Sequence, residues 1–81
     1  MSKPTRKDPL CQYVQRSLKS YFKDMNGEEP TNLYQMVISE TEKPLLEVVM
    51  QQSESNQTRA SRILGINRNT LRKKLKQYNL E

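Results

Sequence analysis

The chain has 81 residues, enough for one small domain, since domains usually hold roughly 100–200 residues. It contains no histidine and a single cysteine, Cys11. These counts exclude imidazole catalysis, His-ligated metal sites, cysteine-rich zinc sites and an intrachain disulfide. We therefore expect no enzyme, no metal and no cofactor. A chain this short buries only about 60% of its unfolded surface, so we expect a partner subunit to supply further burial.

Positive charge is concentrated in the last third of the chain. Fourteen basic and nine acidic residues give a formal net charge of +5. Residues 1–55 hold seven basic and eight acidic residues, whereas residues 56–81 hold seven basic residues against Glu81 alone. Clustered basic charge is typical of nucleic-acid-binding proteins. No apolar run reaches the 18 or so residues of a membrane span, and the charged N-terminus is not a signal peptide. We expect a cytoplasmic protein.

One amphipathic helix is predicted near the N-terminus. The polar residues 1–8 are expected to form a disordered tail. Apolar residues then recur at three- and four-residue steps and predict a helix over about 10–25. Gly27 follows, and a glycine just past a helix can take the left-handed conformation that ends it. Cys11 lies on this helix, where we expect it to be a small packing residue.

A second, longer helix is predicted over about 33–52, with Asn32 as its N-cap. Its apolar stripe crosses Pro44 without losing phase, which favours one kinked helix over two separate helices. The stripe includes the residues that we assign to a dimer core: Leu45, Val48 and Val49. Three further apolar residues lie off the stripe, and we expect a second subunit to cover them: Ile38, Leu46 and Met50.

Residues 56–78 predict two short helices joined by a tight turn at Gly65, which is the helix-turn-helix pattern, with its motif at about 57–76. Asn56 and Asn67 are placed to cap the two helices. The second helix can then project into a DNA major groove about 12 Å wide. The residues expected to point inward are Ala60, Ile63 and Leu64 on the first helix, and Leu71, Leu75 and Tyr78 on the second.

The face of the second helix opposite its apolar residues is predicted to meet DNA. Arginine can bond guanine through two donors and asparagine can pair with adenine, so Arg68 and Asn67 are the candidates for base recognition, with Arg72 and Lys73 as further possibilities. Lys74 lies nearer the buried side and ranks lower. The start of the first helix offers free N–H groups to phosphate. The predicted phosphate contacts are Asn56, Thr58, Arg59 and Lys76.

Two other functions compete with duplex DNA binding. The alternative is a helical protein-interaction adaptor whose basic C-terminal end docks an acidic protein partner. RNA binding ranks lower, because few aromatic residues are placed to stack on bases. A titration with duplex DNA and with RNA separates these possibilities.

The segment Asn56-Gln57-Thr58-Arg59-Ala60, followed by residues 65–76 (GINRNTLRKKLK), resembles the Fis family, the bacterial factor for inversion stimulation. Upstream pairs and runs such as Tyr21-Phe22 and Glu42-Lys43-Pro44-Leu45-Leu46 are similar to the first two helices of that family, so the resemblance covers about residues 9–80. The C-terminal part is also similar to the helix-turn-helix of NtrC-type regulators. The upstream helices, with no ATPase domain before them, favour a stand-alone Fis-like protein.

The resemblance implies an all-α homodimer in which the first two helices of each subunit intertwine, with Pro44 at the kink of the family. It also implies a nucleoid-associated transcription regulator that binds degenerate sites on double-stranded DNA. The two recognition helices of such a dimer lie too close together for straight DNA, so the duplex must bend. Carried across by position, the DNA contacts of the family fall on Asn56, Thr58, Arg59, Asn67, Arg68, Thr70, Arg72 and Lys73.

The sequence departs from the family pattern at both ends. Eight residues precede the first predicted helix, too few for the mobile arm that contacts a site-specific invertase, which argues against that partner. Glu54 and Ser55 stand where a basic residue and then glycine are common, and Gln77 stands where a second lysine is typical. Asn69 replaces a usual glycine. These changes bear on the contacts with flanking DNA.

Overall fold

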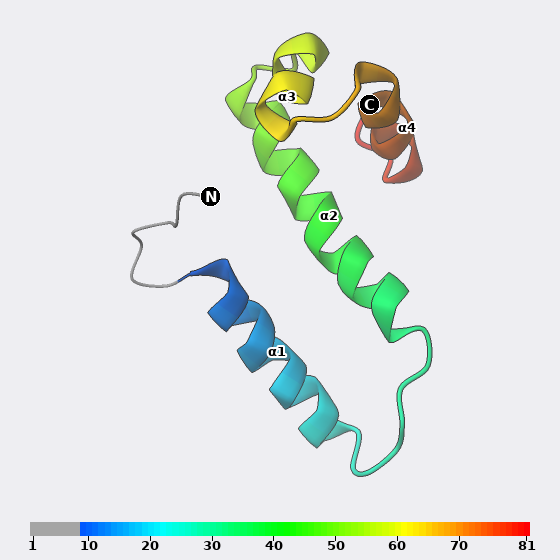
Figure 1. The fold of residues 1–81 in the computed structure, drawn as a ribbon. Helices are drawn as coiled ribbons and strands as arrows, with labels where there is room; N and C mark the ends of the chain where they lie inside the picture. The colour runs from blue at the N-terminus through cyan, green and yellow to red at the C-terminus, as the bar shows by residue number, and fades with distance from the viewer. Residues whose placement is uncertain (1–8) are drawn as a thin grey trace. The chain divides into compact units, whose positions relative to one another are not determined.

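The computed structural model describes residues 9–81, and the predicted disordered tail, residues 1–8, lies outside this range. Four α-helices follow one another along the chain and no strand occurs in the described residues, which confirms the all-α prediction. The chain forms two compact units. The first contains α1, and the second contains the other three helices. The helices are α1 (Leu10–Asp24), α2 (Leu33–Gln52), α3 (Gln57–Leu64) and α4 (Arg68–Gln77) (Figure 1).

The helix of the first unit, α1, is amphipathic but buries none of its residues within this chain. Tyr21 and Phe22 meet edge to face, with ring centroids 6.2 Å apart, and Leu10 is 74% exposed. After the helix, Gly27 has a φ of 88°, the left-handed conformation expected of a glycine that follows a helix. The apolar stripe of α1 therefore needs cover beyond what this helix supplies.

The first helix of the second unit, α2, runs without interruption through Pro44. Proline has no N–H and so removes one backbone hydrogen bond from a helix interior. The helix nevertheless continues on both sides of Pro44, so the structure contains one long helix over this range.

The start of α2 differs from the prediction. Asn32, the predicted N-cap, has a left-handed φ of 58° rather than the extended backbone typical of an N-cap.

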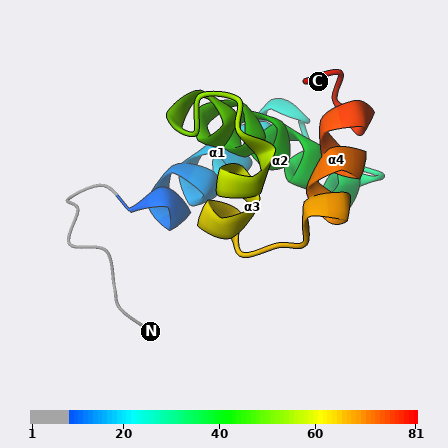
Figure 2. The same cartoon turned by 90° about the horizontal axis from the view of Figure 1, so that it is seen from above.

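The core of the second unit lies where α3 and α4 pack beside the C-terminal half of α2 (Figure 2). This arrangement corrects one expectation. Leu46 is 1% exposed and Met50 packs against the same cluster, so α3 and α4 of the same chain cover them, and no second subunit is required. Leu45 and Val48, by contrast, are 51% and 54% exposed. The buried cluster consists of Leu46, Val49, Ala60, Leu71 and Leu75.

The apolar face of α3 differs from the predicted one. Ala60 and Ser61 are buried, whereas Ile63 is 53% exposed, so the prediction that Ile63 points inward is wrong. The reason is that the Ser61 hydroxyl donates to the carbonyl of Thr58 at 2.8 Å, which satisfies it inside the core. Two residues further along a helix lie on nearly the opposite side, so burial of Ser61 turns Ile63 outward.

Three helices end with the same backbone motif, in which a left-handed residue is followed by an N–H that bonds five residues back. At the end of α3, Gly65 has a φ of 74°, and the next N–H, of Ile66, donates to Ser61 O at 3.1 Å. Corresponding bonds of 2.9 Å after α2 and 2.8 Å after α4 close those helices. Their left-handed residues are not glycines: they are Glu54, with a φ of 56°, and Asn79, with a φ of 58°.

Candidate nucleic-acid interface

Two asparagines cap the helices of the helix-turn-helix. Asn56 has an extended backbone, and its Oδ1 accepts a hydrogen bond from the N–H of Arg59 at 3.0 Å. Asn67 is also extended, and its Oδ1 accepts from the N–H of Asn69 at 2.7 Å. Both predicted N-caps are confirmed. Because each Oδ1 is engaged in its cap, each side chain keeps its NH₂ group for other acceptors.

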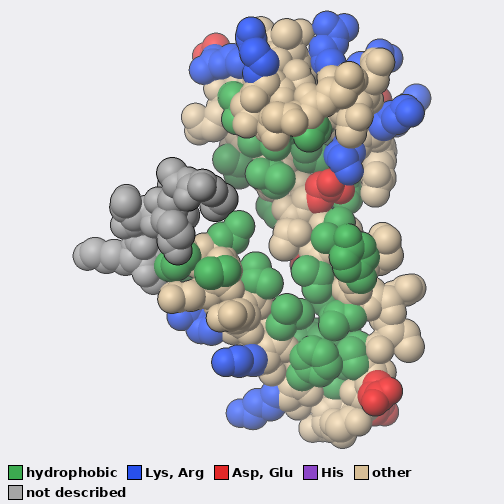
Figure 3. All heavy atoms as spheres, viewed as in Figure 1, with side chains coloured by type: hydrophobic (Ala, Val, Ile, Leu, Met, Phe, Trp, Pro, Cys, Tyr) green, Lys and Arg blue, Asp and Glu red, His purple; other side chains and the backbone are tan. Residues whose placement is uncertain are grey.

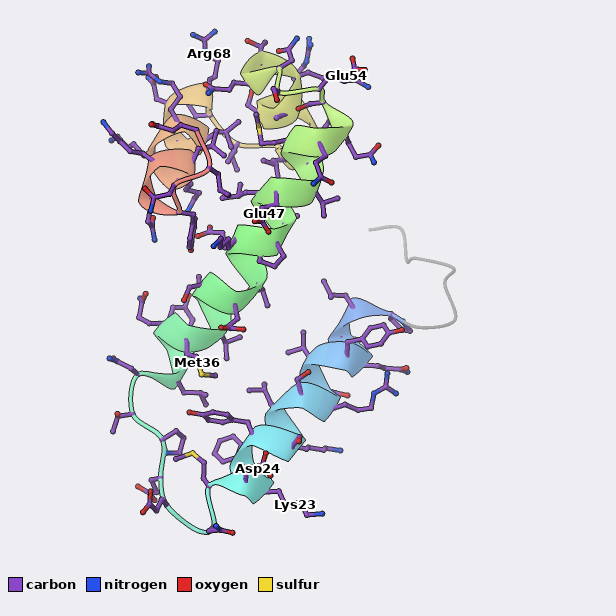
Figure 4. The ribbon with its side chains drawn as sticks, turned by 180° about the vertical axis from the view of Figure 1, so that it is seen from behind. Lys23, Asp24, Met36, Glu47, Glu54 and Arg68 are labelled. Carbon is purple, nitrogen blue, oxygen red and sulfur yellow. The ribbon has the colours of Figure 1, made fainter. Side chains whose placement is uncertain are left out.

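Arg68 links the two helices at the outer end of the unit. It is the first residue of α4, and its Nη1 donates to Oγ1 of Thr58 on α3 at 3.3 Å. Figure 4 shows the Arg68 side chain projecting from this end of the unit. A guanidinium has five N–H donors, so the bond to Thr58 orients the group while leaving donors available to a ligand.

The exposed side of α4 is basic. Leu71 and Leu75 are fully buried, which turns the opposite side of the helix to solvent as predicted. There a shallow hollow of about 270 Å³ is lined by Asn69, Arg72, Lys73, Lys76 and Glu81. Thr70 is exposed on the same helix. Glu81, for which no role was predicted, lies among the basic residues of this hollow.

Basic side chains gather over α3 and α4 (Figure 3). Six of the seven basic residues in this part of the chain are exposed: Arg59, Arg62, Arg68, Arg72, Lys73 and Lys76. The seventh, Lys74, is partly buried. In the described part of the chain, Lys74 forms the sole ion pair, with Glu42. The exposed cations are therefore free of carboxylate partners within residues 9–81, and this surface attracts anions.

Glu42 of α2 binds two residues at the C-terminal end of α4, a contact that the sequence analysis missed. Lys74 Nζ lies 2.7 Å from Glu42 Oε2, and the Tyr78 hydroxyl donates to Glu42 Oε1 at 2.7 Å. The hydrogen bonds from Lys74 and Tyr78 hold the pKa of the Glu42 carboxyl below its ordinary value, and the same bond raises the pKa of Tyr78. In the sequence, the one indication of this contact was the predicted position of Lys74 near the buried side of α4.

Neither a metal centre nor a membrane span emerges from the described residues. No group of three metal-ligating side chains comes together within residues 9–81. None of the helices in this range combines the length and the apolar character that crossing a bilayer requires.

Comparison with known proteins places this architecture in a family. The family model described as "Bacterial regulatory protein, Fis family" matches residues 37–78. The chain is similar to the DNA-binding protein Fis of Buchnera aphidicola subsp. Acyrthosiphon pisum (strain 5A), with 54% identity over 74 residues, 91% of this chain and 76% of that protein. It is 56% identical to DNA-binding protein Fis of Mannheimia haemolytica over 72 residues, which cover 89% of this chain and 74% of that protein. The chain belongs to the Fis family of bacterial regulatory proteins.

Proposed function

We propose that this chain binds and bends double-stranded DNA as a nucleoid-associated transcription regulator, acting by binding rather than by catalysis. The observation that carries the proposal is the exposed basic face of a helix-turn-helix, with Arg68 at its outer end held to Thr58 at 3.3 Å. Relatives that are 54–56% identical to it over 72–74 aligned residues are named DNA-binding protein Fis. A first turn in this position is where recognition helices meet base edges.

The proposed roles divide between base recognition and phosphate binding. Arg68 contacts guanine through guanidinium donors that Thr58 leaves free, and Asn67 donates from its NH₂ group while its oxygen caps α4. Residues at the start of α3 and on the exposed side of α4 hold the phosphates. The proposed phosphate contacts are Asn56, Thr58, Arg59, Thr70 and Lys76. Arg72 and Lys73, also considered above for base recognition, are assigned to phosphate because both line the exposed hollow on α4 rather than its first turn.

We infer that the functional form is a homodimer. Leu45 and Val48 are one turn apart on α2 and more than half exposed, and large apolar side chains so exposed favour association with a second apolar surface. Val49 differs from these two because it is 8% exposed and belongs to the core cluster of its own chain. The dimer contact of α2 would therefore use Leu45 and Val48, with the exposed stripe of α1 as further apolar surface.

A fluorescence titration of duplex DNA tests the proposed recognition. Arg68→Ala should reduce discrimination between a selected site and random duplex by roughly 1–3 kcal/mol for each subunit of the proposed dimer, the contribution of one bidentate base contact. Arg59→Ala should weaken both duplexes alike and reduce the slope of log K against log salt by about 1.8, the effect of one phosphate contact in each subunit of the proposed dimer. Arg62→Ala removes the same charge from an exposed position outside the proposed contacts and serves as the control.

The outcomes distinguish the competing functions. Equal losses on both duplexes for Arg68→Ala would contradict its role in base recognition. Wild-type protein that binds no duplex at moderate salt would contradict the whole proposal and favour a protein-interaction adaptor. Tighter binding to single-stranded RNA than to duplex DNA would instead favour an RNA-binding protein.

Sedimentation equilibrium tests the dimer. Val48→Glu places a carboxylate on the exposed face of α2 and should give a monomer that keeps its helical signal, because Val48 lies outside the core cluster. Ile63→Glu makes the same kind of change at a similarly exposed residue of α3 and should stay dimeric. A dimer that survives Val48→Glu would show that this face of α2 does not join two copies.

A further inference from the structure

The C-terminal end of α4 is attached to α2 by a three-residue polar contact, which we name the Glu42 clamp: Glu42, Lys74 and Tyr78. Both carboxylate oxygens are used, Oε2 by the Lys74 ammonium and Oε1 by the Tyr78 hydroxyl, each at 2.7 Å. Lys74 and Tyr78 are four residues apart and so lie on one side of the helix. A single carboxylate thus holds one full turn at the end of α4.

The clamp differs from an ordinary surface ion pair. The side chains of Lys74 and Glu42 are 33% and 20% exposed, so both are partly withdrawn from water, where an ion pair is screened less. The Tyr78 ring packs against the core cluster, which positions its hydroxyl. The lowered pKa of the Glu42 carboxyl agrees with this geometry, since both partners favour the charged form.

The two ends of α4 are held by different polar contacts. The N-terminal end is tied to α3 by the bond between Arg68 and Thr58, and the C-terminal end is tied to α2 by Glu42. Between these two ends lie Leu71 and Leu75. Their apolar contacts keep α4 packed on the other helices, but such contacts fix the orientation of a helix less closely than hydrogen bonds do. Lys74 lies six residues after Arg68, about 9 Å along the axis of α4 at 1.5 Å per residue. A rotation of α4 about its buried leucines that displaces Lys74 therefore displaces Arg68 as well.

We propose that Glu42 is a positioning residue for DNA recognition: it sets the angle of α4 against α2 and so the place where Arg68 meets a base. The inference rests on the proposed function. The clamp also assigns Lys74 to the fold. Its ammonium is neutralised by Glu42 at 2.7 Å, unlike the neighbouring Lys73, which is exposed and lines the basic hollow.

The first test compares Glu42→Gln with Glu47→Gln. Each variant removes one negative charge from α2, but Glu47 is exposed and makes no ion pair within residues 9–81. The net charge changes equally, and a general electrostatic gain in DNA affinity acts on both duplexes and cancels in the ratio of their affinities. Glu42→Gln should lower the ratio of affinities for a selected site and random duplex roughly fivefold or more. A fivefold change is the low end of the discrimination that one bidentate base contact provides. Glu47→Gln should leave that ratio unchanged.

A milder variant keeps the test valid if Glu42→Gln fails to fold. Tyr78→Phe removes the hydroxyl from the clamp and leaves the ring in the core. It should reduce the same affinity ratio by a smaller factor while circular dichroism reports an unchanged helical content. A ratio equal to that of wild type in both Tyr78→Phe and Glu42→Gln would overturn the inference.

The second test uses the salt dependence of DNA binding to decide whether Lys74 contacts DNA or acts only through Glu42. Lys73→Met should reduce the slope of log K against log salt by about 1.8, since it removes one phosphate contact from each subunit of the proposed dimer. Lys74→Met should leave the slope unchanged while lowering the affinity ratio, because Lys74 acts through Glu42. Equal reductions of slope by the two variants would place Lys74 on the DNA and overturn its assignment to the clamp.

Failure of the inference is distinguishable from failure of the proposed function. Wild-type protein that binds no duplex contradicts DNA binding itself. Wild-type protein that binds and discriminates, with Glu42→Gln indistinguishable from Glu47→Gln, contradicts only the positioning role of Glu42.

Discussion

The first of the two left-handed residues that follow α2, Glu54 and Ser55, offers a direct test of backbone strain. Glu54, Gly65 and Asn79 occupy the same position of the same helix-ending motif, with φ values of 56°, 74° and 58°. Glycine adopts this conformation without a Cβ penalty and asparagine tolerates it, whereas other residues are disfavoured there. Glu54 is therefore the least suitable of the three, and Glu54→Gly should stabilise the protein.

The magnitude follows from two opposing terms. A left-handed conformation costs an ordinary L-residue about 1–2 kcal/mol, and glycine loses roughly 0.5–1 kcal/mol more backbone entropy on folding. The difference predicts a gain of about 0.5–1 kcal/mol. For a domain of this size, that gain raises Tm by roughly 2–8 °C.

Urea unfolding followed by circular dichroism measures this effect, at one protein concentration because the stability of a dimer depends on it. Glu54→Gln removes the same charge but keeps the Cβ, so it should leave the free energy of unfolding nearly unchanged. Glu54→Asn should give an intermediate gain. A midpoint for Glu54→Gly no higher than that of Glu54→Gln would refute the assignment of strain to this residue.

Two further predictions concern the core and the clamp. Leu46→Ala should cost about 2–5 kcal/mol in urea unfolding, the range for a fully buried leucine, whereas Leu45→Ala, at an exposed residue, should cost much less when measured on the monomeric Val48→Glu background. Because the folded pKa of Glu42 lies below its ordinary value of 4.5, its contribution is present above that value and is lost as pH falls through the folded pKa. Thermal melts should therefore show a Tm difference between wild type and Glu42→Gln at pH 7 that shrinks below pH 4.5, and a constant difference would contradict the ion pair.

The local parts of the fold were predictable because their signals are local. Apolar periodicity identified four helices, and the two asparagines that precede α3 and α4 cap them as expected. Gly27 and Gly65 both have the positive φ that a glycine allows. Each of these features depends on residues within a few positions of one another, so short-range rules suffice.

The tertiary contacts were less predictable, since nothing in the local pattern specifies them. Glu42 and Tyr78 are 36 residues apart, and no periodicity or local motif in the sequence connects them. The choice of partner for Leu46 had two solutions, a second subunit or the helix-turn-helix of the same chain, and periodicity does not distinguish them. Ile63 was misplaced because a serine that satisfies its own hydroxyl can be buried in place of an apolar residue.

The interleaving of exposed and buried residues on α2 has a consequence for the DNA. Leu45 and Val48 each precede a buried residue, Leu46 and Val49, and one residue is a rotation of about 100° around a helix. The proposed contact between copies and the seat of the recognition helix therefore lie on adjacent sides of one rod. Such a rod with its side chains is about 10–12 Å thick. A regulator whose halves are joined by a flexible tether can stretch to half-sites of varied spacing. In the proposed dimer both surfaces belong to one continuous helix, so their separation is fixed and the duplex must supply the adjustment.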